Sequence, residues 1–256
     1  MHCDNKNLNA ETLVPILMQV PLNNDLHKRV RNLLQGWNYQ QDMDSAAGAV
    51  FEAFWKHLLA DTFHDELPEN YWPYGGDRWF EVVRNLVKQP NSSWWDNKKT
   101  PALEDRDQIF RQAFSEAVDE LEIILGKDTS RWRWGNLHTT TFRHLTLGKS
   151  GIAPLEAIFN RGPFSTAGGS SIVNATAWNA TKSFAVTWLP SMRMIVDLAK
   201  LESLAIHTTG QSNHAFHPHY DDMVEPWKKI EYHPMLWGRD AVVANAAAHL
   251  TLMPQP

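Results

Sequence analysis

The 256-residue sequence contains a single cysteine, Cys3, which excludes an internal disulfide and any metal site built from several cysteines. It has no apolar run long enough to cross a lipid bilayer, so no membrane partner is expected. It also has no block of lysines and arginines, and its formal charge of −5 comes from interspersed acids and bases. The sequence therefore shows no basic patch of the kind that binds nucleic acids, and no nucleic-acid partner is expected.

Several sequence signals of enzymes and of targeting are missing as well. There is no glycine-rich phosphate loop of the GxxxxGK[ST] or GxGxxG type. The run Gly169-Ser170-Ser171 lacks the second glycine of the Gly-x-Ser-x-Gly turn that carries the serine of many Ser-His-Asp triads. Residues 1–4 begin neither a basic nor an apolar signal-peptide region, so no signal peptide is expected in this chain.

What the sequence does have is a change of pattern near residue 150. Before it, apolar residues recur with the period of a helix, which predicts helices over about 13–20, 30–37, 45–58 and 105–125. Ser45 is the expected N-cap of the third helix, and Gly126 is the expected stop of the fourth. The predicted buried stripe of the fourth helix consists of Ile109, Phe110, Ala113, Phe114, Ala117, Val118, Leu121, Ile124 and Leu125.

After residue 151 the apolar residues alternate, which is typical of strands. The alternation predicts strands over 184–188 and 192–196, with weaker candidates at 170–178 and 204–207, and leaves 240–252 helical or extended. The expected fold class is α+β in one domain over 1–256, helical over 1–150 and mainly strand over 151–256. A few strands rarely form a stable sheet alone, so these either form a small sheet backed by helices or complete a sheet whose other strands lie elsewhere.

Aromatic residues are abundant, with twelve tryptophans in the chain. Most of them lie in segments with apolar periodicity. Because tryptophan is heavily buried on average, this placement favours a large aromatic core over a surface that stacks sugars.

The most distinctive segment is the polar stretch 208–222. It holds three histidines in six residues, with two carboxylates directly behind them. Imidazoles and carboxylates are zinc ligands, so one interpretation is a metal hydrolase centred on His214, His217, His219 and Asp221. The spacing matches no HExxH helix, and a proline between the last two histidines keeps these side chains off one helical face. The other interpretation is an ordered polar loop whose histidines form hydrogen bonds.

The same stretch carries a family resemblance. It resembles the C-terminal signature of the penicillin acylase family of N-terminal nucleophile hydrolases in the runs Gly210-Gln211-Ser212 and Pro218-His219-Tyr220-Asp221-Asp222, and in Trp227 and Tyr232-His233-Pro234 beyond. The family typically has a glycine after Gly-Gln-Ser and a serine before Pro-His-Tyr, where this chain has Asn213 and His217. The motif loop, defined as Gly210, Gln211, Ser212, Pro218, His219, Tyr220 and Asp221, therefore has no assigned role.

Other segments match the family in the same order along the chain. They are the Trp-Gly-x-x-His segment with Trp134, Gly135, His138, Phe142 and His144, the Phe-x-Asp-Glu-Leu turn at 63–67, a glycine-rich stretch at 168–174, a strand at 190–198 and a stretch at 4–15. The resemblance covers nearly the whole sequence, and it implies that the chain is the C-terminal part of a β chain with the αββα fold. His138 and His144 are interpreted as scaffold residues, because neither has an obvious serine or cysteine partner nearby.

The resemblance also implies a chemistry. Family members use an N-terminal serine whose own α-amine acts as the base, and preformed donors hold the oxyanion. In the family these groups and the calcium ligands precede the matched region, so the resemblance assigns this chain no catalytic residue, no metal and no other cofactor.

The implied activity is hydrolysis of N-acyl amides, as in penicillin acylases of antibiotic metabolism or in acyl-homoserine lactone acylases. The implied partners are a small N-acyl amide substrate and the upstream α chain and N-terminal β portion. The family resemblance further implies a periplasmic or secreted protein.

Two further interpretations stay open. The chain is alternatively a catalytically inactive truncated fragment or a binding module. Cys3 is a second candidate nucleophile only if Met1 and His2 are removed, and the bulky His2 disfavours simple methionine removal. Otherwise Cys3 is expected to be an inert thiol.

Overall fold

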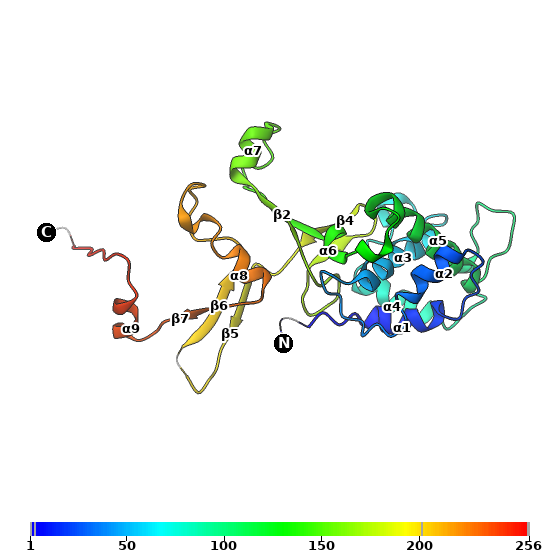
Figure 1. Ribbon diagram of the computed structural model, residues 1–256, viewed down its shortest axis with the longest axis horizontal. Helices are drawn as coiled ribbons and strands as arrows, with labels where there is room; N and C mark the ends of the chain where they lie inside the picture. The colour runs from blue at the N-terminus through cyan, green and yellow to red at the C-terminus, as the bar shows by residue number, and fades with distance from the viewer. Residues whose placement is uncertain (1, 3, 201, 255–256) are drawn as a thin grey trace. The chain divides into compact units, whose positions relative to one another are not determined.

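The computed structural model describes residues 2, 4–200 and 202–254, so the expectations for Cys3 fall outside the described residues. The chain divides into two compact units, unit 1 (Met1–Leu189) and unit 2 (Pro190–Pro256), and each is considered by itself (Figure 1). The single-domain organisation expected from the sequence stays a prediction. No helix among the described residues is both long and apolar enough to cross a membrane.

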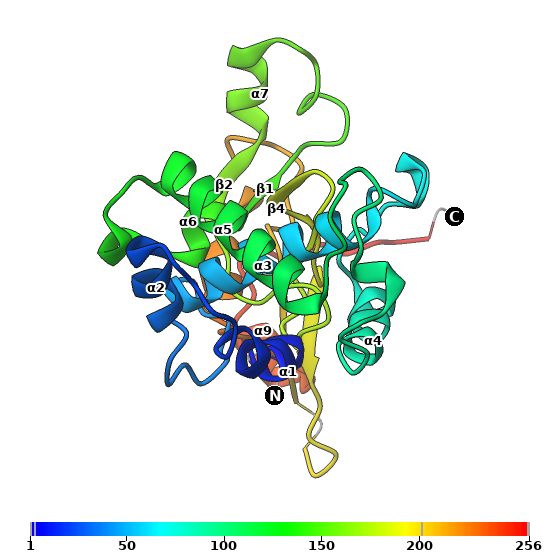
Figure 2. The ribbon, with the colours of Figure 1, turned by 90° about the vertical axis from the view of Figure 1, so that its right-hand side faces the viewer.

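Unit 1 begins with a layer of helices. Their bounds are α1 (Leu8–Leu17), α2 (Asp25–Asn32), α3 (Ala46–Phe63), η1 (Glu69–Tyr71), α4 (Asp77–Leu86), η2 (Ser93–Trp95), α5 (Arg106–Leu125), η3 (Thr129–Arg131) and α6 (Trp134–Leu137). The long α5 packs along α3, which lies in the middle of the layer (Figure 2). This order confirms the helix-rich first half.

Three helix ends are marked by local features of the chain. The Ser45 hydroxyl accepts a hydrogen bond from the Gly48 amide at 2.9 Å and caps α3. Asp105 and Gln108 form a reciprocal capping box at the start of α5. Gly126 ends the same helix with a φ of +84°, a backbone region that favours glycine.

The predicted helix at 30–37 is wrong in its bounds. The side chain of Asn24 accepts hydrogen bonds from the Leu26 and His27 amides, so α2 begins at Asp25 and ends at Asn32. The apolar residues that follow lie in turns that end at Gly36, whose φ is +73°. Periodicity alone did not separate a helix from the compact turns behind it.

Aromatic side chains fill the space between α3 and α5. The Phe54 ring lies 5.3 Å from the Phe110 ring and 6.3 Å from the Phe114 ring. Six of the twelve tryptophans are buried, namely Trp55, Trp95, Trp132, Trp134, Trp178 and Trp227. The predicted aromatic core is therefore confirmed. One member of the predicted stripe is wrong, because Ile124 is 49% exposed at the last turn of α5.

The second part of unit 1 consists of short strands. Their bounds, with one intervening helix, are β1 (Thr139–Phe142), α7 (Ala153–Phe159), β2 (Arg161–Ser165), β3 (Ala177–Asn179) and β4 (Ser183–Trp188). β1 pairs with β2 and β3 pairs with β4, both antiparallel. The predicted strand at 184–188 is confirmed, whereas the candidate at 170–178 is extended only from Ala177 onward. The helix α7 stands away from the helical layer at the end of β1 and β2 (Figure 2).

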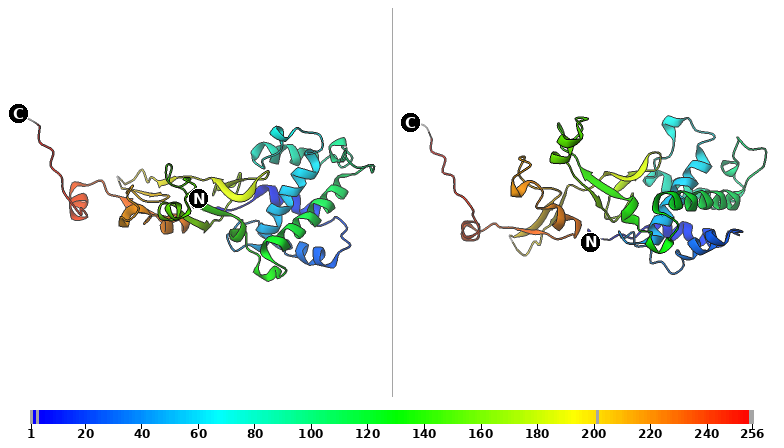
Figure 3. Two further views of the ribbon diagram at one scale, coloured as in Figure 1. Left: turned by 90° about the horizontal axis from the view of Figure 1, so that it is seen from above. Right: turned by 45° about the horizontal axis from the view of Figure 1, so that its top comes forward.

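Unit 2 is a three-stranded antiparallel sheet with short helices. Its bounds are β5 (Met192–Ile195), β6 (Ser203–His207), η4 (Pro218–Tyr220), α8 (Val224–Lys228), β7 (His233–Met235) and α9 (Arg239–Ala244). β5 and β6 confirm the strands predicted at 192–196 and 204–207. The orange helix α8 lies beside β6 (Figures 1 and 3).

The packing of α8 depends on one tryptophan and one arginine. The indole of Trp227 is 2% exposed, and the guanidinium of Arg193 lies 4.5 Å from its ring centre. The same guanidinium donates to the Trp227 carbonyl at 2.7 Å. A buried arginine needs such partners, so this pair fixes the short helix on β5.

Candidate functional site

The motif loop of unit 2 is held together by backbone contacts. Gly210 lies so close to the backbone of His219 that a Cβ at Gly210 would sit 2.2 Å from the His219 carbonyl oxygen. The amide of Ser212 donates to that same oxygen at 2.9 Å, and the amide of Met223 donates to Thr209 at 2.7 Å. The loop is closed at both ends, and only glycine fits at its crossing point.

The histidines of the stretch 208–222, which contains the motif loop, form hydrogen bonds in its turns. Nδ1 of His214 accepts from the Phe216 amide at 3.3 Å, and Nδ1 of His217 accepts from the His219 amide at 3.1 Å. Nδ1 of His219 lies 2.7 Å from a carboxylate oxygen of Asp222. This geometry supports the interpretation of an ordered, hydrogen-bonded polar loop.

The metal-hydrolase interpretation has no matching geometry. Within residues 4–200 and 202–254, and at residue 2, no three histidines, cysteines or acidic residues converge as metal ligands would. His214 and His217 already use Nδ1 to hold the loop backbone.

The Trp-Gly-x-x-His segment forms a buried junction in unit 1. The ring of His138 is 0% exposed and stacks on Trp134, with 4.4 Å between ring centres. Its Nδ1 lies 2.7 Å from the Phe184 carbonyl and its Nε2 lies 3.0 Å from the Thr176 hydroxyl. The short Nδ1 contact requires a proton on Nδ1, because a carbonyl oxygen only accepts.

The burial of His138 supports its interpretation as a scaffold residue. It lowers the pKa of the imidazole to about 4, although the contacts to Phe184 and Thr176 act in the opposite direction. A neutral ring without solvent access cannot exchange protons with a substrate. His144, at the end of β1, instead accepts from the Thr146 and Leu147 amides and holds a turn.

The glycine-rich stretch 168–174 completes this junction. The Gly168 carbonyl accepts from the Trp134 indole at 2.9 Å, and its amide donates to the Gln41 carbonyl at 2.9 Å. Gly168 has a φ of +86°, and a Cβ there would lie 2.1 Å from the Asn174 carbonyl oxygen. The Asn174 side chain in turn donates to the Asn5 side chain at 3.0 Å. The junction thus ties three distant parts of unit 1 together.

The sequence reasoning missed a buried carboxyl group, that of Glu52 on α3. Glu52 is 2% exposed, and burial raises its pKa to about 8 against the opposing effects of Trp178 and Asn7. The side-chain carboxamide of Asn7 donates to the Glu52 carboxyl group at 2.9 Å. The indole N–H of Trp178 faces the same carboxyl but makes no hydrogen bond of good geometry.

A second missed group lies between α3 and α5. Nδ1 of His57 lies 3.2 Å from Glu116 and Nε2 lies 2.9 Å from Glu120, which also pairs with Lys56. Burial lowers the pKa of His57, but these two carboxylates outweigh it and raise the pKa to about 9. Burial and the Glu116 charge raise the pKa of the nearby Asp61 to about 7. The i, i+4 spacing of the two glutamates was the available signal, but only the fold places a histidine between them.

Comparison with known families gives one match over most of the chain. The family model of penicillin amidase matches residues 1–244. It includes the motif loop, the Trp-Gly-x-x-His segment and the glycine-rich stretch, in agreement with the resemblance found from the sequence.

Curated relatives carry matching names. The chain is 30% identical over 200 residues to the acyl-homoserine lactone acylase QuiP of Pseudomonas syringae pv. syringae, covering 73% of this chain and 24% of that protein. The corresponding enzyme of Pseudomonas aeruginosa is 28% identical over 209 residues, with the same shares of both chains. Penicillin acylase 2 proenzyme of Pseudomonas sp. SE83 is 22% identical over 230 residues, covering 89% of this chain and 29% of that protein. The chain thus spans about a quarter of the length of these relatives.

A solved structure has the same fold. The thermostable penicillin G acylase of Alcaligenes faecalis superposes with a TM-score of 0.57 at 16% identity, covering 99% of this chain and 48% of that chain. The chain accordingly has part of the penicillin acylase fold of N-terminal nucleophile hydrolases, with mixed helix and strand as expected. With a family model matched along residues 1–244, this chain belongs to the penicillin amidase family.

Proposed function

We propose that this chain is part of an amidohydrolase that cleaves the amide bond of N-acyl substrates, with acyl-homoserine lactones as the favoured class. The observation that carries the proposal is the family match over residues 1–244. The relatives named acyl-homoserine lactone acylases, 28–30% identical, favour that substrate class over penicillins. The chain contributes framework to the enzyme and lacks the attacking group.

The framework role is supported by what the described side chains do. His138 and Trp134 are buried, and the histidines of the motif loop hold backbone turns. The Thr176 hydroxyl lies 3.0 Å from Nε2 of His138 and 2.7 Å from the Ala167 carbonyl, and its residue is fully buried. A nucleophile must reach its substrate, so this pair does not supply the reaction.

The partner that completes the site is an upstream polypeptide carrying the N-terminal serine. The short strands of unit 1 pair only in twos, and sheets of two strands are rarely stable by themselves, which favours completion by further strands. The resemblance implies calcium for the family, and we propose that upstream residues bind it, as they do in the family. We propose a periplasmic or secreted location for the complete enzyme.

The proposal is tested by reconstitution. The 256-residue chain is mixed with the portion of the Pseudomonas syringae relative that precedes the matched region, and release of free homoserine lactone from an N-acyl homoserine lactone is followed. We expect hydrolysis in the mixture and none with either part alone, because the serine and its amine come from one part and the framework from the other.

Two results separate the contributions of the parts. A mixture in which the upstream part carries alanine in place of its N-terminal serine is the matched control, and it should be inactive although the parts still associate. Association without hydrolysis by the unaltered mixture would contradict the proposed function. Equal hydrolysis by the 256-residue chain alone would contradict its framework role.

A further inference from the structure

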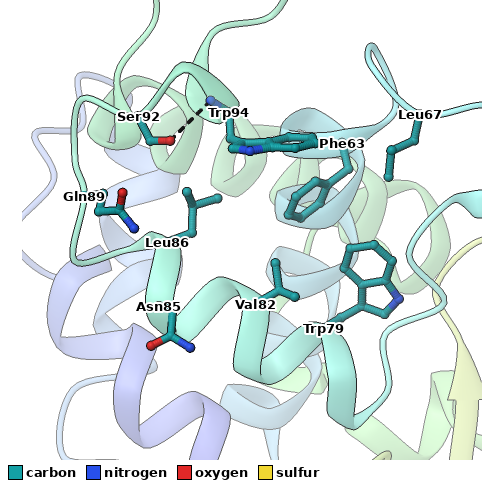
Figure 4. A pocket seen from close by; sticks show the side chains of 9 residues that line it. All are labelled: Phe63, Leu67, Trp79, Val82, Asn85, Leu86, Gln89, Ser92 and Trp94. Atoms are coloured by element: carbon teal, nitrogen blue, oxygen red, sulfur yellow. Dashed lines mark hydrogen bonds between the residues drawn. The ribbon is translucent and has the colours of Figure 1, made fainter.

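A pocket of about 550 Å³ opens in unit 1 between the end of α3, α4 and η2 (Figure 4). The side chains that line it are Phe63, Leu67, Trp79, Val82, Asn85, Leu86, Gln89, Ser92 and Trp94. Its volume falls in the range of about 300–1,000 Å³ that is usual for small-molecule sites. None of the roles described above uses this pocket.

One side of the pocket is an aromatic wall. The Phe63 ring lies 5.1 Å from the Trp79 ring and 5.6 Å from the Trp94 ring, tilted by 54° and 55°. Val82 and Leu86 complete this wall from α4 (Figure 4). Trp94 is 39% exposed and Val82 is 37% exposed, so apolar surface remains open to solvent here. Covering it with an apolar group would be favourable.

The opposite side carries uncharged polar groups, Asn85, Gln89 and Ser92 (Figure 4). The Asn85 side chain is engaged on its own helix, since it donates to the Glu81 carbonyl at 2.9 Å and accepts from Lys88 at 3.3 Å. The Ser92 oxygen accepts weakly from the Trp94 amide at 3.5 Å and keeps its own hydroxyl proton to donate. The exposed carboxamide of Gln89 has a donor and an acceptor to offer.

The described lining carries no charge, which favours an uncharged ligand. An ionised head group needs an opposite charge or several strong donors when it leaves water, and the nine lining residues include no acid or base. A carboxamide pairs with a glutamine carboxamide and a serine hydroxyl at no such cost.

We propose that this pocket binds a small neutral amphiphile, whose alkyl or aryl body lies against Phe63, Trp79 and Trp94 and whose uncharged amide head meets Gln89 and Ser92. The test follows binding to the 256-residue chain and not hydrolysis, so its outcome does not depend on the proposed function. Occupation by a segment of a longer polypeptide is the competing outcome of the test.

The probes are octanamide and octanoate, which share one tail and differ in the charge of the head. Titration calorimetry of the 256-residue chain at pH 8 should show octanamide binding at one site. Octanoate should bind at least about tenfold more weakly, because its carboxylate loses water and none of the nine lining residues supplies a cation. Equal affinity for both probes, or no binding of octanamide, would overturn the proposal; the second result leaves the pocket to a polypeptide segment.

Substitutions place the probe in the pocket. Val82→Trp fills the space between the aromatic wall and the helix and should weaken octanamide binding by roughly tenfold or more. Ile123→Trp is the matched control, since Ile123 is 85% exposed on α5 outside the lining, and it should leave binding unchanged. Unchanged binding to the Val82→Trp variant would place the ligand elsewhere and overturn the site.

A variant that gains affinity for octanoate must be folded, so such a gain cannot be attributed to misfolding. Val82→Lys adds a cation at the pocket and should reverse the preference, so that octanoate binds more tightly than octanamide. Ile123→Lys adds the same charge elsewhere and should keep the amide preference. A variant that shows unaltered thermal unfolding but no reversal would contradict the placement of the head group.

Discussion

Replacing Trp134 with alanine is expected to lower the free energy of unfolding of unit 1 by about 4 kcal/mol, because a fully enclosed indole leaves a large cavity. Its ring stacks on His138 at 4.4 Å and lies about equally far from Trp178 and Phe184, at 6.2 Å and 6.1 Å. Its N–H also holds the Gly168 carbonyl at 2.9 Å, so the substitution leaves a buried acceptor unpaired. Urea unfolding followed by circular dichroism measures the loss.

Two controls show whether the effect belongs to this junction. Trp134→Phe keeps a stacked ring and loses the indole N–H, so its loss should be smaller than that of the alanine variant. Trp188→Ala removes an indole that is 61% exposed on β4 of unit 1 and should change stability by no more than about 0.5 kcal/mol. A loss below about 1 kcal/mol for Trp134→Ala would contradict the central place of this side chain.

Replacing Glu52 with glutamine is expected to stabilise the protein at neutral pH but not at pH 4. The folded-state pKa of Glu52 is raised from 4.5 to about 8, so the folded protein keeps a proton that the unfolded chain releases. Stability contributed by the neutral carboxyl is therefore present below pH 4.5 and lost as the pH rises to about 8. Glutamine has no proton to lose, and its carbonyl still accepts from Asn7.

Relative to the parent, the free energy of unfolding of Glu52→Gln should be higher at pH 7 than at pH 4 by about 3 kcal/mol. This figure follows from the difference between pH 7 and the pKa of the glutamate in the unfolded chain. Urea unfolding of variant and parent at both pH values measures it. His138 changes stability in the opposite sense, because its folded pKa is lowered to about 4 and protonation of the unfolded chain below about pH 6.5 favours unfolding. This contribution is common to both proteins and cancels in the comparison.

The control Glu69→Gln removes a surface carboxyl and should change stability by no more than about 0.5 kcal/mol at either pH. If the difference between Glu52→Gln and the parent were the same at pH 4 and pH 7, the Glu52 carboxyl would be ionised in the folded state. That result would contradict its burial among Asn7 and Trp178.

Among the helix starts that one side chain determines, the sequence analysis predicted that of α3 at Ser45 and missed those of α1 and α2, which Asn7 and Asn24 cap. Ser45 and Asp105 cap α3 and α5 through their own oxygen atoms, which need only the next three residues. The bounds of α2 were missed because Asn24 begins the helix earlier and Gly36 ends the following turns. There the apolar residues face the core from turns as readily as from a helix.

Features that join distant parts of the chain were beyond the sequence. Glu52 lies in an apolar helix, and only the fold places Asn7 and Trp178 beside it. His57 pairs with two glutamates that lie about sixty residues away. The motif loop was found through its composition, and its histidines hold the loop, but no contact of the described residues assigns it a role in catalysis. For this chain, the proposed function rests on the family resemblance and not on the chemistry of particular side chains.

The framework role is tested most directly by the mass of the chain after exposure to an activated acyl donor. The purified 256-residue protein is incubated with a p-nitrophenyl ester of a medium-chain fatty acid, and intact-protein mass spectrometry is used to search for an acyl adduct. We predict no stoichiometric acylation and no turnover of an N-acyl anilide, because the proposed function places the attacking serine and its amine on another polypeptide segment. A single acyl group on one side chain of this chain, formed together with amide turnover, would contradict the account.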